Sequence, residues 1–302
     1  MENKNKIVEI IEFTDPVCTW CWGSEPTIRK LETVYGNQLK VSYVMGGLVR
    51  DIRDFNDSAN GIGGSVESSN RNIASHWVEA SSRHGMPVNA EAFNLFSDEH
   101  PSTYPLNIAY KAAQLIDEDI ANVYLRLMRE ATIFDGRLTN KPEVLVEMAN
   151  EAGVDLVKFL ENLENGNADK AFQEDLQKTK DYGVRGFPSF LVKYGDKEML
   201  LRGYQDFDRL NAIIKSMTAG VVVPKNITNK DEDIFNFLGR YYRVTPIEVM
   251  YTFDLSAKEI DAFVDEYVDK KVLRKIEKGN GYFIEFIDNV VCDPITGICN
   301  PL

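Results

Sequence analysis

Apolar positions in the first fifty residues follow two different patterns. The runs KIVEIIEF (6–13) and LKVSYVM (39–45) are short, largely apolar stretches of the kind that form buried strands. Between them, residues 24–36 place apolar side chains three or four positions apart, which predicts an amphipathic helix ending at a glycine. A strand, a helix and a second strand this close together predict a parallel pair joined by a crossover.

The middle of the chain changes to a helical pattern. Residues 50–69 are rich in Gly, Ser, Asn and Asp and predict a surface loop, whereas the block at about 66–182 predicts consecutive helices. Strand signals return at 188–194 and 197–203, joined by a Gly195-Asp196 turn, and a helix follows. This order predicts a small α/β sheet with a large helical insertion between its two halves.

The last quarter of the chain has the pattern of a separate module. Residues 226–288 predict three helices and then a hairpin, for which Asn280-Gly281 is a type I′ turn signal. That order is typical of a winged helix-turn-helix. We therefore expect a first domain at 1–222, a small winged-helix-like α+β module at 226–288 and a tail at 289–302.

The net charge and the hydropathy of the chain limit the classes of partner that we expect. The formal charge of −13 over 302 residues repels phosphate backbones and anionic lipid, so we expect no nucleic acid and no membrane as partner. The polar start MENKNK and the lack of an 18-residue apolar run predict a cytoplasmic protein. A homodimer is a further expectation.

The stretch DPVCTWCWG holds the first of two cysteine pairs. Cys18 and Cys21 have a spacing that suits redox chemistry, half of a zinc site or structural thiols. A strand before the pair and a helix after it favour redox chemistry, because the free amides at a helix N-terminus favour a thiolate. Cys18 would then attack a disulfide, and Cys21, one turn later, would resolve the mixed disulfide.

These residues carry a resemblance to a known family. DPVCTWCWG, the helical insertion and GVRGFPSFLV together resemble the DsbA-like branch of the thioredoxin superfamily over residues 6–219, with the FrnE-like cytosolic group as the nearest pattern. The resemblance implies a thioredoxin fold in which Phe187 and a cis-Pro188 dock the substrate. The chain departs from the family in the dipeptide Thr19-Trp20 and in the bulk of Phe187.

The resemblance implies a protein disulfide oxidoreductase that works in the reductase or isomerase direction on client proteins or small thiols. It implies no organic cofactor, since the electrons reside on sulfur, and no metal. Trp20 would line the substrate groove, and Asp15 would either relay a proton for the resolving thiol or only form the turn. The alternative is a redox-gated binding or adapter protein that uses the fold without turnover.

The second pair, Cys292 and Cys299, lies in the tail with turn residues between its members. Three interpretations stay open for this pair. It is a tail cystine or two exposed thiols, a shuttle that exchanges electrons with Cys18 and Cys21, or half of a four-cysteine zinc site.

Overall fold

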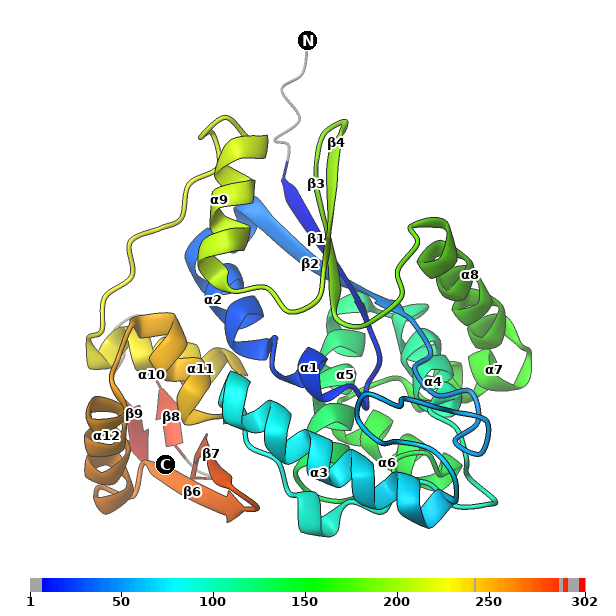
Figure 1. Ribbon diagram of the computed structural model, residues 1–302. Helices are drawn as coiled ribbons and strands as arrows, with labels where there is room; N and C mark the ends of the chain where they lie inside the picture. The colour runs from blue at the N-terminus through cyan, green and yellow to red at the C-terminus, as the bar shows by residue number, and fades with distance from the viewer. Residues whose placement is uncertain (1–6, 242, 288–289, 293–298, 302) are drawn as a thin grey trace.

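A four-stranded mixed sheet forms the centre of the first domain (Figure 1). The computed structural model describes residues 7–241, 243–287, 290–292 and 299–301. The strand order is β2-β1-β3-β4, with β1 parallel to β2 and antiparallel to β3. These strands are β1 (Val8–Thr14), β2 (Leu39–Met45), β3 (Ser189–Tyr194) and β4 (Lys197–Arg202).

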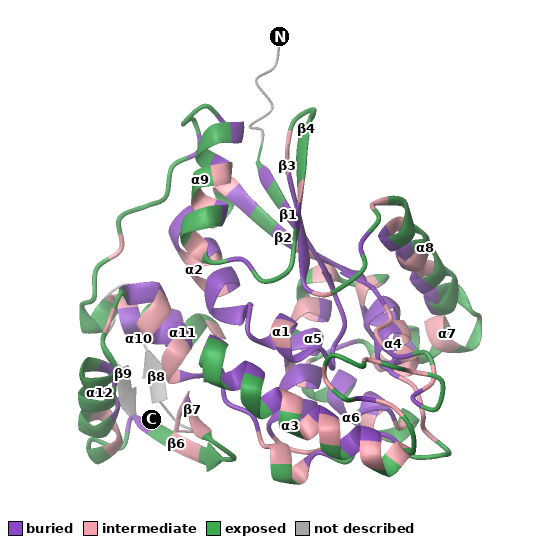
Figure 2. Ribbon diagram, in the orientation of Figure 1, coloured by how far each residue is buried: buried purple, intermediate pink, exposed green. Residues whose placement is uncertain are grey.

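Both faces of β1 are covered, which is why its sequence is mostly apolar (Figure 2). Ile10 packs in the large core together with α2 (Glu25–Tyr35), and Ile11 and Phe13 pack in a smaller cluster on the other face. The helix predicted at 24–36 begins at Glu25 and contacts α9 (Phe207–Met217). The cysteines lie before it: Cys18 is the N-cap of the separate four-residue helix α1 (Thr19–Trp22), and Cys21 lies within that helix.

Helices occupy the chain between β2 and β3. They are α3 (Val66–His84), the 3-10 turn η2 (Ala90–Ala92), α4 (Tyr104–Gln114), α5 (Glu118–Ile133), α6 (Pro142–Glu151), α7 (Leu156–Glu164) and α8 (Asn167–Asp181). A second 3-10 turn, η1 (Gly36–Gln38), leads into β2. No helix in the described part of the chain is long and apolar enough to cross a membrane.

The C-terminal module has three helices, a small sheet and a core of its own. Its elements are α10 (Asp231–Tyr241), β5 (Arg243–Val244), α11 (Pro246–Phe253), α12 (Ala257–Asp269), β6 (Leu273–Lys278) and β7 (Gly281–Phe286), followed by the paired strands β8 (Val290–Cys292) and β9 (Cys299–Pro301). The predicted class is confirmed: an α/β fold with a helical insertion and a small α+β module.

The module is docked tightly on the first domain. Helix α11 packs along α2, and Phe283 of β7 joins the large core, where its ring centroid lies 4.5 Å from that of Phe134. The turn predicted at Asn280-Gly281 is wrong by one position, because Lys278 pairs with Gly281 and leaves Gly279 and Asn280 as the loop. Asn280 instead serves the docking contact.

Candidate functional site

Cys18 caps the first turn of α1. A tight turn after β1, closed by a 3.1 Å hydrogen bond from the Cys18 amide to the Asp15 carbonyl, brings the cysteine to the helix start. There its Sγ accepts a 3.2 Å hydrogen bond from the Cys21 amide. The structure thus brings Cys18 and Cys21, both free thiols, to the start of the short helix α1, whereas the helix that the sequence predicts begins later, at Glu25.

Cys21 is fully buried. Burial raises the pKa of its thiol well above the usual range, and the hydrogen bond with Cys18 and the nearby Glu12 carboxyl add to the rise, while Arg129 opposes it. Beside a free Cys18, this environment therefore favours the protonated thiol at Cys21.

A cavity of about 200 Å³ lies beside Cys18. We call residues 50–64, between β2 and α3, the cover loop; its Phe55 and Ile62 line the cavity together with Cys18, and Trp77 of α3 lines it too. A pair of backbone hydrogen bonds between Asp57 and Ile62, at 2.8 and 2.9 Å, holds the loop in a compact turn. Cys18 itself is 6% exposed.

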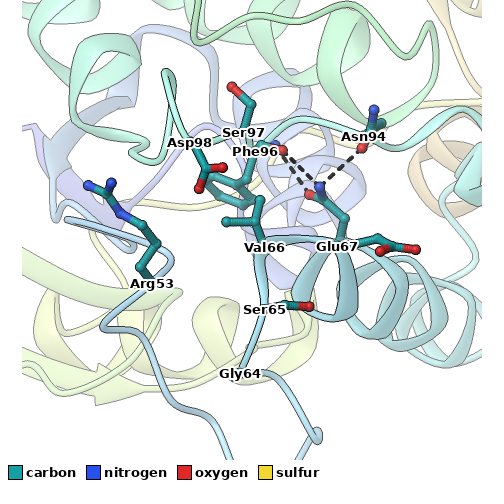
Figure 3. A pocket seen from close by; sticks show the side chains of 10 residues that line it. Arg53, Gly64, Ser65, Val66, Glu67, Asn94, Phe96, Ser97 and Asp98 are labelled. Atoms are coloured by element: carbon teal, nitrogen blue, oxygen red, sulfur yellow. Dashed lines mark hydrogen bonds between the residues drawn. The ribbon is translucent and has the colours of Figure 1, made fainter.

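The wall of the cavity behind the cover loop is fixed by an asparagine. Asn70 of α3 donates to the Phe96 carbonyl at 2.9 Å and accepts from the Phe96 amide at 3.2 Å. Phe96 lines both the Cys18 cavity and an open pocket of about 530 Å³ at the start of α3, which is bordered by Arg53 and Asp98 (Figure 3).

The predicted substrate-binding residues gather at the same place. Trp20 and Phe187 line the cavity with Cys18, and the peptide bond between Phe187 and Pro188 is cis. The Phe187 ring packs on Gly46 so closely that a Cβ there would lie 1.9 Å from the ring. Trp20 is half-buried, and its ring centroid lies 6.3 Å from that of Tyr204. Substrate binding by these residues stays a prediction.

Asp15 does not face the resolving thiol. Its carboxylate accepts four hydrogen bonds of 2.8–2.9 Å, from the amides of Val17 and Leu48 and from the side chains of Thr103 and Asn107. These bonds tie the cysteine turn to the end of β2 and to α4. The geometry supports the turn-forming interpretation of Asp15 over the proton relay.

The carboxyl group near Cys21 is Glu12, which the sequence reasoning missed. Glu12 lies on β1 and is bonded by Arg129 Nη2 at 3.3 Å, while Arg129 also bonds Glu25. Arg126 pairs with Glu25 at 3.1 Å and, through two nitrogens at 2.7 and 3.0 Å, with Glu248 of α11. We call these five residues the buried charge network. The network connects the Glu12 carboxyl group, near Cys21, with Glu248 of the C-terminal module.

Glu12 should make stability depend on pH. Burial raises its pKa from 4.5 to about 7, with Glu25 adding to the rise and Arg129 opposing it. Between these values the folded protein keeps a proton that the unfolded chain releases, so Glu12 lowers the free energy of unfolding as pH rises from about 4.5 to 7. We expect Glu12→Gln to remove this component in urea unfolding curves from pH 5 to 8. A slope unchanged by Glu12→Gln would show that Glu12 ionises normally.

The tail cysteines are only partly within the described structure. The register of β8 and β9 pairs the backbone of Cys292 with that of Cys299. Their side chains and residues 293–298 lie outside the described residues, so the three interpretations stay open. In the described part of the chain, no group of three or more His, Cys, Asp or Glu side chains is arranged to hold a metal.

The fold and the cysteine site define the class of this protein. The family model described as thioredoxin matches residues 12–211, and the chain belongs to this family. The fold is similar to that of the cytosolic disulfide reductase DsbM from Pseudomonas aeruginosa, with a TM-score of 0.55 and 19% identity over 70% of this chain and 98% of that one. The DsbA-like resemblance is thus confirmed.

Relatives that match nearly the whole chain are named as adapter proteins and not as reductases. The chain is 26% identical to the ClpXP adapter protein SpxH of Halalkalibacterium halodurans, over 95% of this chain and 91% of that protein. It is 25% identical to the protein of the same name from Bacillus subtilis, over 92% and 89%.

These relatives overturn the main functional prediction. Their name describes an adapter, so the prediction of a thiol–disulfide oxidoreductase acting on thiol clients is wrong, and the alternative, a binding or adapter protein, agrees with them. The part of the enzyme prediction that is supported is the fold, which is also that of a cytosolic disulfide reductase.

Proposed function

We propose that this protein is an adapter that binds a partner protein and presents it to a ClpXP protease, without redox turnover. The relatives that cover nearly all of the chain suggest the class. The structural observation that carries the proposal is the burial of Cys18, which is 6% exposed and lies beside a cavity that Phe55 and Ile62 of the cover loop also line. A catalytic thiol has to be reached by the client disulfide, whereas an adapter needs only an accessible surface.

The accessible part of the site is aromatic. Tyr204 is 37% exposed, and its ring lies edge-on to that of Trp20, which lines the Cys18 cavity with the half-buried Phe187. Aromatic side chains that are partly exposed on a rigid base are typical binding hot spots. We therefore assign partner binding to this rim. The proposal also requires a compartment shared with the protease, and cytoplasmic localisation stays a prediction.

The test separates recognition from redox chemistry. In cells that lack the protein, we expect the half-life of at least one ClpXP-dependent protein to lengthen. Cys18→Ser/Cys21→Ser should restore its degradation, and Trp20→Ala/Tyr204→Ala should not. Binding of that protein to each purified variant should follow the same order, with a loss of about tenfold or more for the aromatic pair.

The matched measurement is insulin reduction. We expect the wild type to be no faster than Cys18→Ser/Cys21→Ser. If the cysteine variant behaves like the deletion and the wild type reduces insulin, the adapter proposal fails.

A further inference from the structure

A second cavity, of about 730 Å³, lies where the C-terminal module meets the first domain. Its wall comes from α2, α5 and the end of α6 on one side, and from the end of α10 and β5 on the other. The volume is in the range of roughly 300–1,000 Å³ that ligand sites have, and such sites are common at junctions between domains. The adapter proposal makes no use of this cavity, and Cys18 is not among the described residues that line it.

Three arginines of the wall have donor groups that stay unused within the described structure. The Nε atoms of Arg29 and Arg243 are buried and have no hydrogen-bond partner among the described residues. Glu248 Oε1 lies 3.6 Å from Arg29 Nε, which is too far for a hydrogen bond. Arg240 is exposed and forms no ion pair in the part of the chain that the structure describes. Because buried donors without partners are costly, they indicate a ligand that supplies acceptors.

Tyr241 brings two of these arginines to the same part of the wall. The guanidinium carbon of Arg29 lies 3.9 Å from the centroid of the Tyr241 ring, and that of Arg240 lies 5.1 Å from it. The Tyr241 hydroxyl donates to Glu32 at 2.8 Å, which holds the ring in place. A guanidinium held against a ring is preorganised to donate two parallel hydrogen bonds to a carboxylate.

The carboxylates of the wall limit the charge of the ligand. Glu25 and Glu130 are already paired with Arg126, at 3.1 and 2.6 Å. Asp119 and Glu151 are exposed, so water screens their charges. Because the described wall holds four arginines and five carboxylates, a ligand with a single negative charge is favoured over a multiply charged one.

We propose that this cavity binds a small organic acid with one carboxylate and an apolar body. Arg29, Arg240 and Arg243 donate to the carboxylate, and the apolar body lies against Val123 and Leu127, which also line the cavity. Since the arginines belong to α2, α10 and β5, the ligand bridges the first domain and the C-terminal module. The inference goes beyond the adapter proposal and does not depend on it.

The test compares three probes of one shape on the full chain. The probe is 3-phenylpropionate, and 3-phenylpropionamide and 3-phenylpropylamine are its uncharged and cationic counterparts. Binding at pH 7 is followed by ligand-detected NMR titration, and for a molecule of this size we expect a Kd of about 1–10 mM. The amide and the amine should bind at least about tenfold more weakly, because neither supplies a carboxylate to the arginine donors.

Two pairs of variants locate the site. Arg240→Gln should weaken binding of 3-phenylpropionate about tenfold, whereas Arg209→Gln, also at an exposed arginine but outside the cavity, should leave it unchanged. Val123→Trp, which narrows the cavity, should weaken it as well. Val157→Trp is the control, because Val157 is 78% exposed on α7 and does not line the cavity. All four positions are exposed, so the variants should fold.

Hydrogen exchange measures the bridging. Saturating 3-phenylpropionate should slow exchange in α10 and β5, while exchange in α7 stays the same. Arg240→Gln should abolish this protection.

Several results would overturn the inference. These are a lack of saturable binding of 3-phenylpropionate over the millimolar range, an amide or amine that binds as tightly as the acid, and unchanged binding in Arg240→Gln. Exchange in α10 that does not respond to the bound acid would show that the ligand does not bridge the two parts. None of these outcomes bears on the degradation of a partner protein, so the adapter proposal is judged separately.

Discussion

Replacing Arg129 with methionine should lower the free energy of unfolding by about 3–5 kcal/mol. Arg129 is fully buried and donates to Thr14 at 2.6 Å, to Glu12 at 3.3 Å and to Glu25. Although burial alone would raise the pKa of Glu25, Arg126, Arg129 and Arg29 together hold it at about 2. Without Arg129, Glu25 stays charged in the interior with part of its compensation lost. Urea unfolding followed by circular dichroism measures the effect.

The matched control is an arginine with exposed partners. Arg137 pairs with Glu147 and Glu151 at 3.1 Å on the surface, and Arg137→Met should cost less than about 1 kcal/mol. A second variant tests the mechanism: Arg129→Met/Glu25→Gln should recover part of the loss, because the uncompensated charge is gone. If Arg129→Met costs no more than Arg137→Met, the buried charge network does not stabilise the fold.

The buried charge network is also the part of the site that the sequence does not predict. The strands, the amphipathic helices and the position of the cysteines follow from local periodicity and turn residues, so they could be predicted. The partner of Glu12, in contrast, lies 117 positions away in a helix of the insertion. One signal was present: a glutamate within the apolar run IIEF, directly before the cysteine turn. A charged residue in a strand covered on both faces needs a buried partner.

The sequence predicts where the cover loop lies in the chain, but not that its apolar residues line the Cys18 cavity. Its Gly, Ser, Asn and Asp content indicates a loop, and the structure has one there. Composition does not predict against which part of the fold a loop packs, however, and Phe55 and Ile62 are isolated apolar residues in a polar segment. Both line the Cys18 cavity together with Ile73 and Trp77 of α3, which belongs to the insertion. The motif alone does not predict this tertiary arrangement, in which Cys18 is 6% exposed.

Gly279→Ala should loosen the C-terminal module from the first domain and lower the free energy of unfolding by about 2–4 kcal/mol. A Cβ at Gly279 would lie 2.1 Å from the Val88 carbonyl oxygen and 2.6 Å from Asn89 Cα, and neither backbone atom can move away as a side chain would. The adjacent Asn280 makes three docking bonds, two with the Val88 backbone at 2.8 and 3.1 Å and one to Ser81 at 2.9 Å. A displaced turn loses all three.

Gly153→Ala is the control that distinguishes the loss of the docking contact from backbone strain. Gly279 has a φ of +56° and Gly153 one of +79°, so alanine is disfavoured at both, but no atom lies within 4 Å of a Cβ at Gly153. Gly153→Ala should therefore cost about 1–2 kcal/mol. Hydrogen exchange gives the second measure, since Gly279→Ala should speed exchange in β6 and β7 while β1 and β2 stay protected. Equal losses in the two variants, with unchanged exchange in β7, would mean that the turn does not hold the module.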